Sequence, residues 1–86
     1  MDSKALKKAE PVKAPMPGLV LKILVSVGQQ VSKGDGLIIL EAMKMENRIL
    51  ADCHGTIQNI RVIPGANVSV GDLLCFLKPE EETNCK

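Results

Sequence analysis

The 86-residue sequence contains almost no aromatic side chains and no long apolar run. Phe76 is its one aromatic residue, and it has no Trp or Tyr. Single-stranded nucleic acids are commonly bound by stacking their bases on aromatic rings, so this mode of binding is not expected. A helix that crosses a membrane needs about 20 consecutive apolar residues. The sequence therefore predicts no direct insertion into a membrane.

Charges of one sign do not accumulate in the central part of the chain either. Between residues 14 and 77, five basic residues are balanced by five acidic residues. The basic residues are Lys22, Lys33, Lys44, Arg48 and Arg61, and the acidic residues are Asp35, Glu41, Glu46, Asp52 and Asp72. Binding to phosphates depends on clustered Lys and Arg side chains, so the sequence predicts no nucleic-acid partner.

Signatures of catalysis and of metal binding are also missing from the sequence. It has no Gly-rich phosphate loop, no cluster with metal-ligand spacing and no triad spacing. Its cysteines, Cys53, Cys75 and Cys85, are odd in number and lack C-x-x-C spacing, which favours neither a disulfide framework nor a zinc site. We therefore predict reduced thiols, no catalytic residue and no metal site. Reduced thiols indicate an intracellular location, and we favour the cytoplasm over the mitochondrial matrix.

What the sequence does contain is an internal repeat. Residues 14–40 align with residues 51–77 without a gap, at a constant offset of 37. Eleven of the 27 aligned positions are identical, namely Ala14/Ala51, Gly18/Gly55, Ile23/Ile60, Val25/Val62, Gly28/Gly65, Val31/Val68, Ser32/Ser69, Gly34/Gly71, Asp35/Asp72, Leu37/Leu74 and Leu40/Leu77. Two copies are too few for a solenoid, which needs three or more repeats. The repeat therefore predicts one domain with a pseudo-twofold axis.

Within each half, the apolar residues follow the pattern of short strands and tight turns. Residues 19–27 and 56–63 are rich in Val, Ile and Leu, and shorter apolar runs follow at residues 37–40 and 73–77. No stretch has the 3.6-residue apolar period of a helix. The sequence therefore predicts an all-β fold. We expect a flattened eight-stranded barrel or sandwich, in which two pseudo-twofold-related four-stranded halves pack their apolar faces together.

The shared core positions of the two halves predict one irregularity in each half. These positions are Val20/Ile57, Ile23/Ile60 and Val25/Val62. Their spacing is three residues and then two, so strict strand alternation breaks between the first two pairs. A β-bulge at that point would restore the facing of the side chains. Gly34 and Gly71, at equivalent places, predict turns with positive φ.

The sequence also predicts where the domain begins and ends. Residues 14–77 form the domain, and residues 41–50 form a hairpin that joins its halves. Lys44 lies where the turn of this hairpin is expected, although Met43–Glu46 lacks the Asn-Gly or Gly-Xaa pair typical of such turns. Residues 1–13, which carry four Lys and one Pro, are predicted as a flexible tail or linker. Residues 78–86, which contain an acidic run, are predicted as a second flexible tail.

A six-residue motif surrounds Lys44 at the centre of the repeat. It reads Glu41-Ala42-Met43-Lys44-Met45-Glu46, with Ala14-Pro15-Met16-Pro17-Gly18 before it and with Ala51 and Gly55 after it. Together these residues resemble the biotinyl carrier domain of biotin-dependent carboxylases, decarboxylases and transcarboxylases, over about residues 14–77. Some carriers of bacterial acetyl-CoA carboxylases have an inserted thumb in the first half. The gap-free repeat here is similar to the thumbless type.

The resemblance, and not the spacing of any residues, implies a cofactor and partners. In this family the lysine of the Ala-Met-Lys-Met motif is the covalent attachment site of biotin. This carries over to Lys44, with Ala42, Met43 and Met45 as the recognition motif. A biotin-protein ligase would attach the biotin, which would carry CO2 between a biotin carboxylase and a carboxyltransferase or decarboxylase. The carrier itself would catalyse nothing. The family fold is a flattened eight-stranded barrel with the modified lysine on its central hairpin.

Two alternative functions remain open from the sequence. A lipoyl carrier domain has a similar strand pattern but typically has Asp-Lys-Ala around its lysine, whereas Met43 and Met45 flank Lys44 here. A structural or adaptor module of the same fold would leave Lys44 unmodified. The role of the two methionines is open as well, because they could cover the end of the barrel as adaptable apolar side chains or be recognised by a partner.

Overall fold

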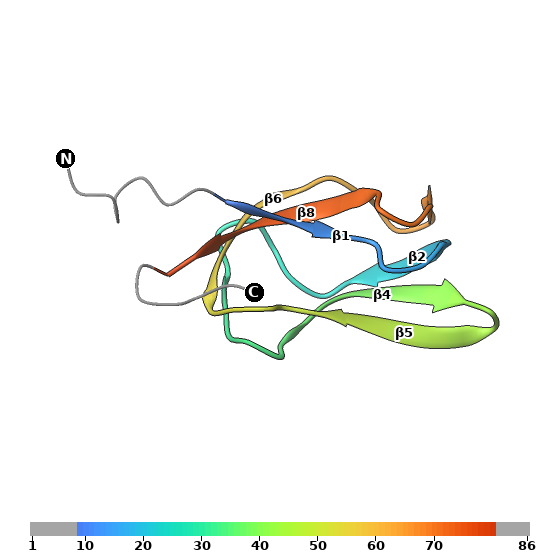
Figure 1. The fold of residues 1–86 in the computed structure, drawn as a ribbon, viewed down its shortest axis with the longest axis horizontal. Helices are drawn as coiled ribbons and strands as arrows, with labels where there is room; N and C mark the ends of the chain where they lie inside the picture. The colour runs from blue at the N-terminus through green and yellow to red at the C-terminus, as the bar shows by residue number, and fades with distance from the viewer. Residues whose placement is uncertain (1–8, 81–86) are drawn as a thin grey trace.

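The computed structural model, which describes residues 9–80, consists of two stacked β-sheets (Figure 1). Its strands are β1 (Glu10–Lys13), β2 (Gly18–Ile23), β3 (Gln30–Val31), β4 (Gly36–Ala42), β5 (Met45–Leu50), β6 (Gly55–Ile60), β7 (Asn67–Val68) and β8 (Leu73–Pro79). Sheet A has the order β1-β8-β6-β3 and sheet B the order β5-β4-β2-β7, and neighbouring strands are antiparallel. The predicted eight-stranded, all-β fold is confirmed. Among the described residues, no helix is long and apolar enough to cross a membrane.

The internal repeat reappears strand by strand. Adding the offset of 37 to the bounds of β2, β3 and β4 reproduces the bounds of β6, β7 and β8, and β1 falls on the last four residues of β5. One part of the prediction is wrong, because the halves do not form one sheet each. Sheet A joins β1 and β3 of the first half to β6 and β8 of the second. Each half thus contributes strands to both sheets, and the two halves share one core.

Each half carries the predicted bulge at an equivalent place. The register of β2 against β4 shifts between Val20 and Lys22, and that of β6 against β8 shifts between Ile57 and Asn59. The extra residue of each bulge lets the side chains of Val20 and Ile57 point into the core, where they are 1% and 0% exposed. Of the other predicted core positions, Val25 is buried, and Ile23, Ile60 and Val62 are partly buried against the core. β2 and β6 end earlier than the apolar stretches that predicted them, because residues 24–27 and 61–64 form loops.

The predicted tails are partly wrong. Residues 10–13 form β1, which pairs with β8 from Glu10 opposite Leu77 to Lys13 opposite Leu73, and β8 continues to Pro79. Pro11 does not interrupt its strand, because β1 lies at the edge of sheet A, where a residue without an N–H group is tolerated. The remaining parts of the two predicted tails, residues 1–8 and 81–86, lie outside the described residues.

Gly34 and Gly71 occupy equivalent turns with a left-handed backbone. Their φ angles are 95° and 87°, and a β-carbon added to either would meet nothing within 4 Å. An alanine would therefore be disfavoured by backbone conformation and not by a steric contact. We expect Gly34→Ala and Gly71→Ala each to lower the free energy of unfolding by at least about 1 kcal/mol, and by similar amounts, in denaturant titrations. Unchanged stability of both variants would contradict the assignment of these turns.

The prediction of reduced thiols is wrong for Cys53. Cys53 is disulfide-bonded, whereas Cys75 is a free thiol buried in the core. An odd number of cysteines excludes complete pairing, but it does not exclude a single disulfide. The count of cysteines was therefore too weak an argument for a fully reduced chain.

Burial raises the pKa of the Cys75 thiol from 9.0 to about 11. Between these values the unfolded chain has lost the thiol proton while the folded chain still holds it. Since the unfolded chain then binds fewer protons, stability falls as the pH rises from 9.0 to about 11. We expect the melting temperature to fall over this window, and to fall less steeply in Cys75→Ala, which has no thiol to titrate. An equal fall in both proteins would contradict a buried, protonated Cys75.

Candidate functional site

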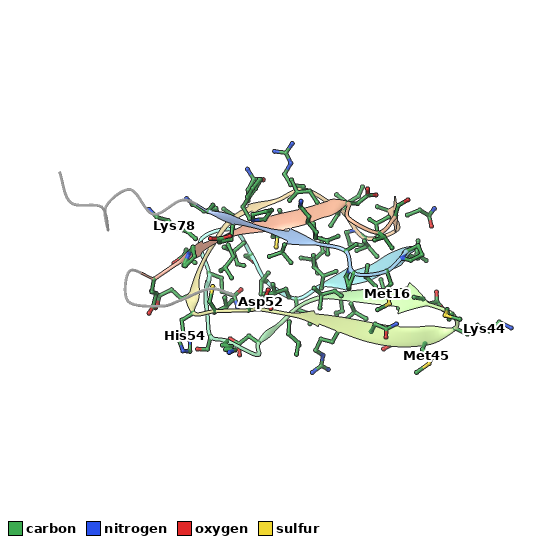
Figure 2. The ribbon with its side chains drawn as sticks, viewed as in Figure 1. Met16, Lys44, Met45, Asp52, His54 and Lys78 are labelled. Atoms are coloured by element: carbon green, nitrogen blue, oxygen red, sulfur yellow. The ribbon has the colours of Figure 1, made fainter. Side chains whose placement is uncertain are left out.

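Lys44 lies at the tip of the hairpin formed by β4 and β5, at one end of the molecule (Figure 2). β4 ends at Ala42 and β5 begins at Met45, and these two residues are opposite each other in the ladder. Met43 and Lys44 are therefore the two turn residues, with φ angles of 55° and 65°. Positive φ at both central positions identifies a type I′ turn, whose twist matches that of the flanking strands.

The residues of this turn are unusual for its type. Type I′ turns are mostly built from Asn, Asp and Gly, and a non-glycine residue held at positive φ costs roughly 1–3 kcal/mol. Such a conformation persists where the surrounding structure fixes it. Here the strands below the turn do so, because Leu40 pairs with Asn47 in the ladder and both Leu40 and Ala42 are buried. Lys44 is consequently held on a turn of defined geometry.

The two methionines beside Lys44 do not pack over the end of the barrel. Met43 is 93% exposed and Met45 is 65% exposed. Strand alternation stops at Ala42 because the next two residues form the turn, so the open alternative in which the methionines cover the end of the barrel is not the one the structure supports. Of the two roles left open by the sequence, recognition by a partner is the one that exposed thioether side chains fit.

Two residues for which the sequence predicts no role support this end of the molecule. The side-chain amide of Asn47 donates a hydrogen bond of 3.2 Å to the carbonyl oxygen of Met45, the first residue after the turn. Met16, in the loop before β2, is partly buried and packs against the core (Figure 2). Met16 is thus the motif methionine with a packing role. Its place in a Pro-containing segment gave no signal of burial.

The base of the turn carries two acidic side chains. Glu41 and Glu46 are exposed and directly opposite each other in the ladder, an arrangement of like charges that destabilises a strand pair. The described residues supply no side-chain hydrogen bond or ion pair to either carboxylate or to the Lys44 amine. Nor does any group of three or more His, Cys, Asp or Glu within residues 9–80 have the arrangement to hold a metal ion.

The exposed lysine lies on a hairpin between two related sets of strands. The sequence of the chain also matches a known family. The family model described as "Biotin-requiring enzyme" matches residues 10–77. The chain belongs to this family. The matched segment includes all of β1.

Individual members of the family show the same similarity. A biotin carboxyl carrier protein of Streptococcus mutans is 53% identical over 66 residues, which cover 77% of this chain and 51% of that protein. A protein of Mycobacterium leprae named as a homolog of the biotinylated protein TB7.3 is 41% identical over 69 residues, which cover 80% of this chain and 97% of that protein. The chain thus spans about half of the first relative and nearly all of the second.

A solved structure extends the similarity to the fold. The urea carboxylase of Kluyveromyces lactis superimposes with a TM-score of 0.78 and 36% sequence identity. The match covers 81% of this chain and 6% of that much longer chain. The fold described above therefore occurs as a small part of a large carboxylase.

Proposed function

We propose that this chain is a biotin carboxyl carrier domain with biotin attached to Lys44. The observation that carries the proposal is the type I′ turn, which presents the Lys44 amine at one end of the molecule between two exposed methionines. Membership of the biotin-requiring family and the similarity to a biotin carboxyl carrier protein support the choice of cofactor. Ala42, Met43 and Met45 are proposed as the motif that the attaching enzyme reads.

The chemistry at Lys44 consists of one bond, formed by another protein. A biotin-protein ligase would activate the carboxyl group of biotin with ATP as an acyl adenylate, releasing pyrophosphate, and the Lys44 amine would displace AMP to form an amide. The residues around Lys44 fit this role, because the amine is exposed and neither carboxylate at the base of the turn is paired with it. Bound biotin supplies a ring nitrogen that can carry CO2. The chain itself holds the lysine away from the sheets and leaves proton removal to the ligase.

The remaining partners are proposed from the same family membership. A biotin carboxylase would load the carrier, and a carboxyltransferase or decarboxylase would unload it, as domains or subunits of one assembly. Tethering raises the effective concentration of a carried group to roughly millimolar with a short flexible linker. The contribution of this domain is therefore positional. A cytoplasmic location belongs to the same proposal, and fractionation of the source cells would test it.

The limits of the domain are part of the proposal too. β1 and the end of β8 belong to the sandwich, so we propose that residues 10–79 are needed for folding. Residues 1–8 remain a proposed tail or linker, and the substrate that is finally carboxylated or decarboxylated is a property of the proposed partners.

Intact mass spectrometry separates the proposed function from its alternatives. The purified chain would be incubated with biotin, ATP and a biotin-protein ligase, and in parallel with lipoate, ATP and a lipoate-protein ligase. A carrier of biotin gains one biotinyl group in the first reaction and nothing in the second. A lipoyl group would identify a lipoyl domain, and no increment in either reaction would favour a structural module. A known biotinyl domain treated in the same way serves as the positive control.

Substitutions of Met43 can separate the backbone strain of the turn from recognition of the Met43 side chain by the ligase. Asn adopts positive φ far more readily than Met, so we expect Met43→Asn to raise the free energy of unfolding by about 0.5–1 kcal/mol. The same variant loses the exposed thioether and should be labelled by the ligase with a lower kcat/KM. Met43→Leu is the matched control, because it keeps an apolar side chain and the strained backbone. Equal labelling of the Asn and Leu variants would contradict recognition of the Met43 side chain.

A further inference from the structure

β5 is the longest of the four strands that lie at sheet edges. The strand orders leave β1 and β3 at the edges of sheet A, and β5 and β7 at the edges of sheet B. β3 and β7 have two residues each, β1 has four and β5 has six. Exposed edges pair readily with other strands, and proteins usually shorten or block them. β5 is not shortened in this way.

The internal repeat provides a reference for the β5 edge. Because Ala42 and Met45 close the two-residue turn, hydrogen-bonded and non-hydrogen-bonded pairs alternate from there along the ladder. Glu46 and Arg48 fall on the non-hydrogen-bonded positions, so their N–H and C=O groups point away from β4. The equivalent of Arg48 in β1 is Pro11, which has no N–H group to offer. Pro11 therefore blocks pairing at the β1 edge, whereas the N–H group of Arg48 remains available at the β5 edge.

Hollows on both sides leave space beside this edge. On one side, Ile39, Glu46, Arg48 and Leu50 line a cleft of about 370 Å³. On the other side, a hollow of about 310 Å³ is lined by residues of β1 and β5, including Pro11 and Arg48. Within residues 9–80, the side chains of β1 therefore do not close over β5, and these residues leave room for a further strand.

The charge pattern of β5 is complementary to itself. Glu46, Asn47 and Arg48 read acidic, neutral and basic. If two such strands run antiparallel with their Asn47 residues opposite each other, Glu46 of each copy faces Arg48 of the other. We propose that two copies of this chain associate through β5 in this register, so that their B sheets join into one eight-stranded sheet. The interface is isologous, as a twofold axis requires.

Hydrogen bonding and charge select the same register. In this register the outward-directed backbone groups of Glu46 meet those of Arg48 in the second copy, which forms hydrogen-bonded pairs of an antiparallel ladder. A register centred on Glu46 or on Arg48 would place identical charges opposite each other, which is unfavourable in a strand pair. The register centred on Asn47 also leaves the two Lys44 turns toward opposite ends of the shared sheet, where neither covers the other.

The association is weak because the interface is small. Stable complexes bury roughly 1,200–2,000 Å² in total, and a single six-residue edge covers much less. We expect a dissociation constant of roughly a millimolar. The dimer would therefore form at high local concentration, such as that of carriers gathered in one assembly. It does not depend on biotin, so it can be tested independently of the proposed function.

Sedimentation equilibrium of charge-reversed variants tests this register directly. Between about 0.05 and 2 mM, the average mass of the natural chain should rise from that of a monomer toward that of a dimer. Glu46→Lys and Arg48→Glu each create two like-charge contacts across the twofold axis, and each alone should weaken association at least tenfold. The double variant restores opposite charges and should associate like the natural chain. An equimolar mixture of the two single variants should form a heterodimer.

Several outcomes would overturn the proposal. These are a natural chain that stays monomeric over the whole range, single variants that associate as well as the natural chain, or a double variant that does not recover. Arg48→Pro, which copies the residue of the blocked β1 edge, should abolish association, while Arg48→Ala, which keeps the N–H group, should weaken it less. If Arg48→Pro fails to fold, the charge variants still decide. A monomeric natural chain whose Glu46 and Arg48 amides become protected from exchange by added ligase would identify a different polypeptide as the occupant.

Discussion

Replacing Lys44 with Arg is expected to abolish labelling by a biotin-protein ligase without changing the fold. The amide bond needs a primary amine, and the guanidinium group of Arg retains the positive charge but is not acylated. Lys44 is exposed at the tip of its turn, and its side chain makes no hydrogen bond or ion pair with the described residues that the substitution would break. The free energy of unfolding should therefore stay within about 0.5 kcal/mol of the natural value. Intact mass and thermal unfolding followed by circular dichroism measure the two effects.

Two other exposed lysines serve as controls for this substitution. Lys22 lies on β2. Lys33 lies in a loop, where its own backbone N–H donates a hydrogen bond of 3.2 Å to Nδ1 of His54. Lys22→Arg and Lys33→Arg should be labelled as fully as the natural chain. If Lys44→Arg were still labelled and one of these controls lost its labelling, the attachment site would be the lysine replaced in that control. A large loss of stability in Lys44→Arg would show that Lys44 also supports the turn.

The second large effect is expected at Gly18, where β2 approaches the backbone of β4. A β-carbon at Gly18 would lie 2.6 Å from the carbonyl oxygen of Glu41 and 3.2 Å from its carbonyl carbon. Both are backbone atoms at the base of the hairpin, so the strands must separate to admit the methyl group. We expect Gly18→Ala to lower the free energy of unfolding by roughly 2–3 kcal/mol, and to lower kcat/KM for labelling of the folded chain.

Gly55 and Gly36 make this prediction specific. Gly55 is the repeat equivalent of Gly18, and its β-carbon would contact the carbonyl oxygen of Lys78. Gly55→Ala should therefore destabilise the chain by a similar amount, but without a labelling defect in the folded fraction, because Lys78 does not belong to the hairpin. A β-carbon at Gly36 would meet the side chain of Arg48 at 2.7 Å, and this side chain can move. If Gly36→Ala were as destabilising as Gly18→Ala, backbone contact would not be the cause.

Much of the fold was predictable from the sequence because the repeat constrains it twice. The irregular spacing of Val20, Ile23 and Val25 recurs in the second half, and so predicted a bulge that both halves contain. The arrangement of the strands into sheets was not predictable in the same way. A repeat shows that two halves are alike, but it does not show which strands of one half pair with strands of the other. The contacts of β3 with β6 and of β7 with β2 are of this kind.

The ends of the domain and the turn were harder to predict for local reasons. Pro11 favours a linker in isolation, and only the pairing of Glu10 with Leu77 makes an edge strand of this segment. The position of Lys44 at a turn was predicted from the repeat, but the turn type was not. Met and Lys carry no preference for positive φ, so the neighbouring strands, and not the turn residues, determine that conformation. The exposure of Met43 follows from this turn and could not be known without it.

Tandem mass spectrometry of the labelled chain shows directly which residue carries the biotinyl group. Trypsin cleaves after unmodified Lys and Arg, so the natural chain should yield peptides 34–44 and 45–48 around the hairpin. After treatment with biotin, ATP and ligase, an amide on Lys44 should block this cleavage and produce one peptide, residues 34–48, whose fragments carry the biotinyl group on Lys44. Complete cleavage after Lys44, with the biotinyl group on another lysine or on none, would contradict the account.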